Sequence, residues 1–287
     1  MARCDGPIAA DIDVAGFSSL VRSEGEAHWR ELPWRGIDDD YGVLVSEVML
    51  QQTQVKRVIG YWERFMGMFP TIDALAAADN ALVLELWQGL GYNRRALMLK
   101  KCAEECAASH DGALPRSYAE LIALPGIGPS TAAGVLAFAR NEPCVYLETN
   151  VRSVFLHHFF PDAPKVPDKH IIPLVERTCP KEDVRGWYYA LLDYGAYLKS
   201  IMPNPSRRSA AYSRQSRFEG SRRQKRAHIV RIVLANPGIM LQGILDALED
   251  IERKEGRPGV DEREVASIID DLVSEGFFTR EGEGYRA

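Results

Sequence analysis

The chain has 287 residues, 46% of them hydrophobic and 26% charged, and these proportions are typical of a soluble globular protein with two or three domains. No run of 18 apolar residues occurs, which excludes a membrane span, and the first twelve residues lack the apolar core of a signal peptide. The five cysteines are an odd number and widely spaced, so we expect free thiols, a cytoplasmic protein, no metal site and no cofactor.

The net charge of −5 argues at first against a nucleic-acid partner, but the charge is unevenly distributed. Residues 200–226 carry eight basic side chains and one acidic one, a local charge of +7. Residues 227–287 carry seven basic and thirteen acidic side chains, a local charge of −6. The average therefore hides a basic segment (residues 200–226) and an acidic terminal segment behind it.

Apolar residues recur at helical spacing through most of the chain, beginning with Ile12 to Arg30. Almost nothing up to residue 201 alternates with period two, so this region is predicted to be all-α. Further helices are predicted in residues 41–69 (two helices), 72–78, 81–87, 94–109, 118–124, 130–138, 151–160, 171–178 and 187–201.

Pro203-Asn-Pro-Ser206 ends this pattern, and the basic segment that follows is predicted to be irregular and exposed as far as Arg226. The terminal segment predicts three helices, at residues 229–234, 241–248 and 265–275, and a short hairpin at 277–286. Three helices closed by a hairpin are typical of a winged-helix unit.

The stretch Leu124-Pro-Gly-Ile-Gly-Pro-Ser-Thr-Ala132 predicts a tight turn between two helices. Gly126 and Gly128 let the backbone approach another chain closely, and Pro129 starts the second helix where its missing N–H costs nothing. The unpaired N–H groups of a helix start can cradle a phosphate group. The alternative is an ordinary corner between two helices.

Glu47 is the single carboxylate in an otherwise almost wholly apolar helix, Val43-Leu-Val-Ser-Glu-Val-Met-Leu50. Burial disfavours a charged carboxylate, so we expect a raised pKa for Glu47. A carboxylic acid that keeps its proton near neutral pH can act as a general acid. The alternative is a structural glutamate satisfied by a nearby arginine.

Glu148 directly precedes a predicted helix that Thr149 or Asn150 can cap. We expect the N–H groups and the dipole of that helix start to hold the carboxylate ionised. Cleavage of a glycosidic bond requires a neutral acid for the leaving group and an anion for the sugar cation, and Glu47 with Glu148 provides this pair. The alternative for Glu148 is a simple acid at a helix start.

Five motifs, in this order, resemble the helix-hairpin-helix DNA glycosylases, and within them the adenine DNA glycosylases of the MutY type. The resemblance covers about residues 28–200. Its motifs are Leu32-Pro-Trp-Arg35, Val45-Ser-Glu-Val-Met-Leu-Gln-Gln-Thr-Gln-Val55, Leu86-Trp-Gln-Gly-Leu-Gly-Tyr92, Leu124-Pro-Gly-Ile-Gly-Pro-Ser-Thr-Ala132 and Thr149-Asn-Val151.

The resemblance implies an all-α glycosylase fold, a monomer, and double-stranded DNA with a mispaired or damaged base flipped out of the stack. It implies a six-helix barrel with the hairpin and a second helical domain, to which our reading of the residues adds a linker and a winged-helix-like domain. The expected bounds are 40–147 for the barrel, 1–39 plus 148–203 for the second domain, 204–226 for the basic linker and 227–287 for the last domain.

The same resemblance implies a role for each motif residue. By position, Glu47 matches the acid that protonates the adenine ring, and Ser130 stands where lyase members carry a lysine, which implies a monofunctional glycosylase. The remaining positions match the wall of the base pocket (Trp34, Arg35, Leu50), residues that enter the duplex (Gln52, Thr53), and the phosphate clamp with its neighbours (Gly126, Gly128, Ser130, Thr131, Asn150).

The chain departs from the family pattern at several positions. Glu148 stands where the family has aspartate, so the acid is kept with one extra methylene. Asn93 replaces a tyrosine expected to wedge into the DNA, and Tyr189 replaces a glutamate or glutamine expected to face the base. No four-cysteine cluster follows Tyr197, so the iron–sulfur centre of many relatives is expected to be absent.

The basic segment stands where that cluster would be, and its arginines Arg207, Arg208, Arg222 and Arg223 are expected to contact the DNA backbone; the alternative is a solvated linker. The winged-helix-like domain takes the place of a domain that reads 8-oxoguanine. Because its third helix begins Asp261-Glu-Arg-Glu264, a contact with another protein or a structural lid is expected rather than DNA reading.

Three hypotheses for function remain open. The first is a monofunctional glycosylase that removes a mispaired base, adenine. The second keeps the enzyme and changes the base to uracil, thymine or a damaged base. The third is a non-catalytic protein that binds DNA lesions, because a shared fold does not fix a function.

Overall fold

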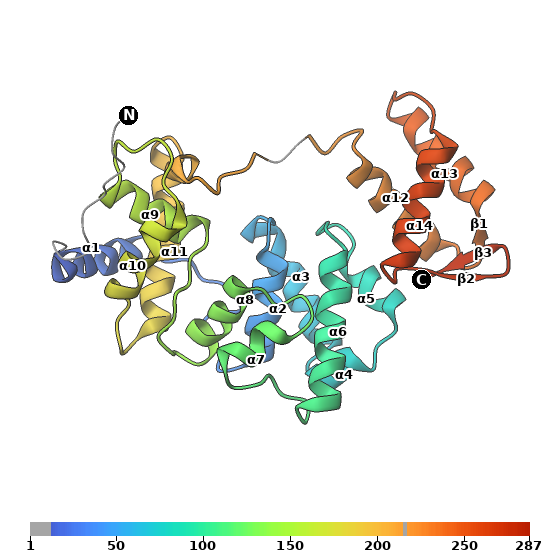
Figure 1. The fold of residues 1–287 in the computed structure, drawn as a ribbon. Coiled ribbons are helices and arrows are strands. Elements are labelled where there is room, and N and C mark those ends of the chain that lie inside the picture. The colour runs from blue at the N-terminus through green and yellow to red at the C-terminus, as the bar shows by residue number, and fades with distance from the viewer. Residues whose placement is uncertain (1–12, 215–216) are drawn as a thin grey trace. The chain divides into compact units, whose positions relative to one another are not determined.

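The computed structural model describes residues 13–214 and 217–287, which are mostly helical (Figure 1). They fall into two compact units, each built from segments distant in the chain. Ile12, the predicted start of the first helix, lies outside the described residues. None of the described helices is long and apolar enough to cross a membrane. The first unit comprises Met1–Glu47, Leu114–Ala123 and Ile127–Arg214, and the second comprises Val48–Ala113, Leu124–Gly126 and Gln215–Ala287.

Four helices of the first unit pack around one apolar core (Figure 1). The ring of Phe17 meets those of Phe155 and Trp187 at centroid distances of 5.4 and 6.1 Å. Gly25 lets the first helix approach Ala190 closely, because a Cβ at Gly25 would collide with that residue. The four helices are α1 (Val14–Ala27), α9 (Thr149–Phe159), α10 (Asp168–Thr178) and α11 (Val184–Ile201).

The turn between two helices predicted at residues 124–132 is present. It joins α7 (Tyr118–Ala123) to α8 (Pro129–Gly134), with Pro129 at the first turn of α8 as expected. The single helix predicted for residues 130–138 is instead divided, because the α-helix gives way to a π-helical turn, η2 (Val135–Ala139). The chain before this region forms α2 (Asp40–Leu50), which carries Glu47.

The second unit contains α3 (Val55–Met68), α4 (Ile72–Ala76), α5 (Asn80–Trp87) and α6 (Arg94–Ser109). Helix α6 packs on α4 and α5, and α3 packs on α5, with the rings of Phe65 and Trp87 in contact at 5.9 Å. The loop between α5 and α6 is a turn, as the sequence predicted, with positive φ angles at Gly89 and Gly91.

The C-terminal part of the second unit has three helices and a small sheet (Figure 1). Its elements are α12 (Arg222–Ala235), β1 (Ile239–Met240), α13 (Leu241–Lys254), α14 (Glu262–Ser274), β2 (Thr279–Glu281) and β3 (Gly284–Arg286). The strands are antiparallel in the order β1-β3-β2, with Met240 opposite Gly284 and Arg280 opposite Tyr285. The hairpin was predicted, whereas β1 was missed because two residues are too short to show an alternating pattern.

The prediction that the basic segment stays irregular as far as Arg226 is wrong at both of its ends. Residues Pro205–Arg208 form a 3-10 helix, η3, and α12 begins at Arg222, where the side chain of Ser221 caps it by accepting a hydrogen bond from Gln224 N. Helix α12 starts before its apolar residues do, so the apolar pattern alone marked only its second half.

Candidate active site

Glu47 lies in α2 among buried apolar side chains, as the sequence predicted. Burial is the main cause that raises its pKa, and the negative charge of Glu148 raises it further. A hydrogen bond from the Tyr146 hydroxyl works in the opposite direction. The resulting pKa of about 8 keeps the carboxyl group protonated at neutral pH, which is the state a general acid requires.

Gly134 provides the space in which the Glu47 carboxyl group lies. It is the last residue of α8, and a Cβ at this position would collide with Oε2 of Glu47. The π-helical turn η2 follows at once, and such turns occur frequently at functional sites. The helix that follows the hairpin turn therefore lies directly against the Glu47 carboxyl group, because Gly134 has no side chain to keep them apart.

Glu148 is itself the N-cap of α9. Its Oε1 accepts a hydrogen bond from Val151 N at 2.9 Å and another from Asn150 N. We had expected Thr149 or Asn150 as the cap and an ionised carboxylate. Burial raises the pKa of Glu148 above its ordinary value, while the two amides and Lys199 lower it and so favour the anion, as expected. The burial of Glu148 depends on distant parts of the chain, and the sequence around Glu148 does not indicate it.

Tyr146 lies at the Glu47 carboxyl group, near enough to Glu148 to sense its charge, and it was not among the residues predicted from sequence. Its hydroxyl donates to Glu47, and burial together with the charges of both glutamates raises the pKa of Tyr146 well above its ordinary value. The phenol therefore stays protonated as a donor. A signal was present, because residues two apart in an extended segment share a face, and Tyr146 stands two residues before Glu148.

The predicted pocket residues of the first unit form a stack of flat groups. The Arg35 guanidinium lies 4.5 Å from the ring centroid of Tyr189, and that ring stacks on Phe138 at 4.9 Å. Arg35 also donates to both carboxylate oxygens of Asp193, at 2.7 and 2.8 Å. Its guanidinium is thus held by the protein, and Trp34 is only 5% exposed. Trp34 and Arg35 are thus largely covered by other protein groups, whereas residues that form the wall of an open pocket would be more exposed.

The predicted DNA-contacting residues Gln52 and Thr53 follow α2 in the second unit. Gln52 is exposed with a φ of +56°, and Leu50 is half-buried at the end of the helix. Arg95 organises this turn, since it donates to Gln51 O at 2.6 Å and to Thr53 Oγ1 at 3.2 Å. Burial lowers the pKa of Arg95 to about 10.

The same guanidinium reaches the loop that precedes α6. Arg95 donates to Gly91 O at 2.9 Å and to Val48 O at 2.8 Å. Tyr92 follows in this loop with a φ of +50° and 38% exposure. Asn93 is half-buried at the start of α6 and makes no capping hydrogen bond with its side chain.

The hairpin residues have the geometry that the sequence predicted for a tight turn. Gly126 has a φ of +75°, and a Cβ there would lie 2.6 Å from Cβ of Met98. Gly128 is the N-cap of α8. Ser130 is exposed, and Thr131 is buried.

The four arginines predicted to bind DNA differ in their contacts. Arg207 is exposed, whereas Arg208 donates to the last carbonyl groups of α9, to Leu156 O at 3.0 Å and Phe160 O at 2.8 Å. Arg222 donates to Asp271 at 2.7 Å and Arg223 to the Tyr92 hydroxyl at 2.7 Å. Arg208 therefore stabilises a helix end. Within residues 13–214 and 217–287, no cluster of His, Cys, Asp and Glu that could hold a metal ion occurs.

Known proteins resemble the chain over its central part. Residues 45–177 match the HhH-GPD superfamily base excision DNA repair protein model. The adenine DNA glycosylase of Buchnera aphidicola subsp. Baizongia pistaciae is 37% identical over 180 residues, which are 61% of this chain and 50% of that protein. The adenine DNA glycosylase of Mycolicibacterium smegmatis is 45% identical over 139 residues, 47% of each chain. The chain spans about half the length of these curated relatives.

Solved structures share the fold at low identity. A thermostable thymine-DNA glycosylase superposes with a TM-score of 0.60 at 21% identity, covering 68% of this chain and 92% of that one. An endonuclease III in a non-covalent DNA complex gives a TM-score of 0.57 at 19% identity, covering 67% and 90%. The family match includes Glu47, Tyr146 and Glu148. Residues 45–177 therefore form a region of the HhH-GPD superfamily of base excision DNA repair proteins.

Proposed function

We propose that the protein is a monofunctional DNA glycosylase that cleaves the N-glycosidic bond of a base flipped out of a DNA duplex. The observation that carries this proposal is the protonated Glu47, with a pKa of about 8, beside Tyr146 and Glu148. The names of the relatives, adenine DNA glycosylase, support the same chemistry.

In the proposed mechanism, Glu47 donates its proton to a ring nitrogen of the flipped base. The electron pair of the bond between that base and sugar C1′ leaves with the base, and an oxocarbenium-like sugar remains. The Glu148 carboxylate stabilises this cation and then accepts a proton from the water that adds to C1′. The Asn150 and Val151 amides and Lys199 favour the anionic form that this step needs.

We propose adenine in a mispair as the excised base. The alternative of uracil, thymine or a damaged base rests on Tyr189, whose ring is stacked between Phe138 and the Arg35 guanidinium where adenine enzymes are expected to have a hydrogen-bonding carboxylate or amide. With both faces of its ring covered, Tyr189 offers a base neither a carboxylate nor an amide, so this residue gives no preference for the hydrogen-bonding edge of adenine.

We further propose that no strand cleavage accompanies base release. The hydroxyl of Ser130 stands where the lyase members have an amine, and a Schiff base needs an amine. The C-terminal helices and sheet, in the order helix, strand, two helices and hairpin, support a winged-helix assignment for residues 222–287.

The test is base release from labelled duplexes that carry adenine, uracil, thymine or an oxidised base opposite each partner, read as strand cleavage before and after alkali. We expect cleavage only after alkali, and only for some duplexes. Glu47→Gln and Glu148→Gln should bind DNA and release no base, while Glu85→Gln, the same change at an exposed carboxylate, should behave as wild type.

Cleavage before alkali would contradict the monofunctional assignment. Binding without release from every duplex would favour the lesion-binding protein. Base release by Glu148→Gln at the wild-type rate would reject the role of the anion.

A further inference from the structure

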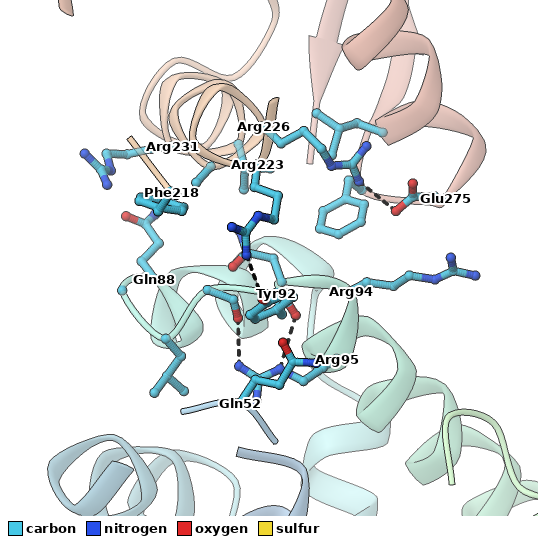
Figure 2. Close-up of a pocket in the computed structure, with 18 of the residues that line it drawn as sticks. Gln52, Gln88, Tyr92, Arg94, Arg95, Phe218, Arg223, Arg226, Arg231 and Glu275 are labelled. Atoms are coloured by element: carbon cyan, nitrogen blue, oxygen red, sulfur yellow. Dashed lines mark hydrogen bonds and ion pairs between the residues drawn. The ribbon is translucent and has the colours of Figure 1, made fainter. Parts of the chain in front are cut away.

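A groove in the second unit joins the loop before α6 to helix α12 (Figure 2). It has a volume of about 720 Å³, which is in the range of ligand-binding pockets. One side is formed by residues 88–95 and Gln52, and the other by Phe218 and residues of α12 and α14. Gln52 and Asn93, both predicted from sequence to contact DNA, thus border the same groove as Arg223.

The groove is strongly basic although the whole chain is acidic. Its lining contains six arginines and one acidic residue, Glu275, which is paired with Arg226 at 2.8 Å. Among the described residues, no ion pair is found for three exposed arginines of the lining, Arg57, Arg94 and Arg231. Figure 2 shows Arg94 and Arg231 extending to either side of Tyr92. Anionic groups are therefore the expected ligands of the rim.

The centre of the groove is a ladder of alternating aromatic rings and guanidinium groups. The Arg223 guanidinium lies 5.9 Å from the ring centroid of Phe218 and 5.8 Å from that of Tyr92, and Arg95 lies 5.6 Å from Tyr92 (Figure 2). Phe218 is 51% exposed. Flat exposed groups of this kind are platforms on which nucleobases stack.

Helix α12 divides its basic residues between two surfaces. Arg222 and Lys225 pair with acidic residues of α14, Asp271 at 2.7 Å and Glu264 at 2.5 Å. Arg223 and Arg231 line the groove instead. The acidic helix α14 therefore neutralises one side of α12 and leaves the groove side positive.

Tyr92 adds a backbone observation that is independent of charge. It is a non-glycine residue with a φ of +50°, between Gly91 at +76° and α6, and Arg95 holds the loop in place. Residues in this sparsely populated conformation cluster at ligand-binding sites, where the surrounding structure maintains the strain.

We propose that this groove binds one unstacked nucleotide of a DNA strand. Its base stacks on the ladder formed by Phe218, Arg223 and Tyr92, and the flanking phosphates meet Arg94 and Arg231. An acidic peptide would use the charges and leave the ladder without a partner, so the observations favour the nucleotide. This inference rests on the proposed function only for the identity of the ligand as DNA.

The test uses the full chain and a fluorescein-labelled single-stranded oligothymidine of twelve nucleotides, with affinity measured by anisotropy at several salt concentrations. Phe218→Ala should weaken binding about tenfold, the loss expected for one stacked base. Arg231→Ala should weaken it and reduce the salt slope by about 0.7, the value for one phosphate contact on a single strand. Tyr212→Ala and Arg263→Ala are the matched controls, because both side chains are exposed and lie outside the groove.

A second measurement locates the base directly. Oligothymidine with one 5-bromodeoxyuridine is irradiated with the protein, and the cross-linked residue is identified by mass spectrometry. We expect cross-links at Tyr92 or Phe218. Cross-links elsewhere, or equal affinities for the four variants, would overturn the proposal, and a peptide or another protein would then be the occupant to seek.

The two proposals fail in different ways. If no duplex loses a base while oligothymidine cross-links in the groove, the glycosylase proposal fails and the proposal that the groove binds a nucleotide is retained. If base release occurs and the groove variants bind oligothymidine with the same affinity as the controls, the groove proposal fails and the glycosylase proposal is retained.

Discussion

A carboxyl group that is protonated at neutral pH is the residue-scale feature on which the proposed chemistry depends. Its apolar surroundings in α2 predicted the raised pKa of Glu47, and the pKa of about 8 confirms that expectation. The raised pKa of Glu47 should affect both the rate of base release and the free energy of unfolding, and each can be measured separately.

The rate of base release should depend on pH through Glu47. Above pH 8 the carboxyl group loses its proton, so the single-turnover rate should fall about tenfold per pH unit with an apparent pKa near 8. A rate that stays constant from pH 7 to pH 9.5 would contradict Glu47 as the proton donor.

Stability should also depend on this group. Between its ordinary value of 4.5 and about 8, the folded protein holds a proton that the unfolded chain has released, so the free energy of unfolding falls as pH rises. Glu47→Gln removes this penalty. Its gain over wild type should be small at pH 5 and on the order of 3 kcal/mol at pH 8.5.

Urea unfolding of both proteins at the two pH values measures the difference, and Glu85→Gln gives the effect of the same substitution at an exposed site. A gain for Glu47→Gln that does not change with pH would show that Glu47 is not titrating in this range.

Gly134→Ala should inactivate the enzyme without unfolding it. The added methyl group collides with Oε2 of Glu47, and a displacement of about 1 Å at a catalytic group costs about a hundredfold in rate. Gly60→Ala in α3 is the matched control, since nothing lies within 4 Å of a Cβ there. Single-turnover rates and DNA affinities are compared; equal rates for the two variants would contradict the packing argument.

The sequence indicated Glu47 and Glu148, whereas its only signal for Tyr146 was the spacing of two residues from Glu148, and it had none for Gly134. The glutamates stand out by their local context, one in an apolar helix and one before a helix start. Tyr146 and Gly134 gain their roles from contacts with Glu47, about 90 residues earlier in the chain. Local patterns carry no information about such distant pairs.

At the scale of elements, helices with a clear apolar period were well predicted, and α6 has the predicted bounds Arg94–Ser109. Helix α12 shows the limit of this signal. Its first turn consists of basic and polar residues that form helices readily but carry no apolar pattern, so it was predicted as irregular. The π-helical turn η2 depends on packing and has no pattern of its own in the sequence.

Arg95 connects two elements, and Arg95→Lys should show its structural value. Lysine keeps the charge and loses the planar fork, so several backbone oxygens around Val48 and Gly91 lose their donor. The free energy of unfolding should fall by about 2–3 kcal/mol.

The neighbour Arg94 is exposed, and Arg94→Lys should change the free energy of unfolding by less than about 0.5 kcal/mol. Chemical denaturation of the two variants provides the comparison. Equal stabilities would mean that the hydrogen bonds of Arg95 contribute little to folding.

At the scale of the whole molecule, the basic segment combines two tasks that its composition could not separate. Arg207 is exposed, whereas Arg208 closes the end of α9. Arg207→Gln should leave stability unchanged and weaken binding to any duplex, with a salt slope reduced by about 0.9.

Arg208→Gln should instead lower the free energy of unfolding by about 1–3 kcal/mol, because it leaves the partly buried carbonyl groups of Leu156 and Phe160 without this donor. Thermal unfolding and salt-dependent affinity are measured for both variants. If Arg208→Gln alone changed the salt slope, the assignment of the two arginines would be reversed.

The position of Arg95 also restricts how the second unit can move. One guanidinium binds the carbonyl groups of Gln51 and Gly91 and so ties together two turns that lie about 40 residues apart in the chain. Neither turn can shift alone without breaking bonds to the other. Gln52 and Tyr92, one on each turn, therefore move together as parts of one rigid unit. A ligand that fixes the position of one turn also fixes the position of the other.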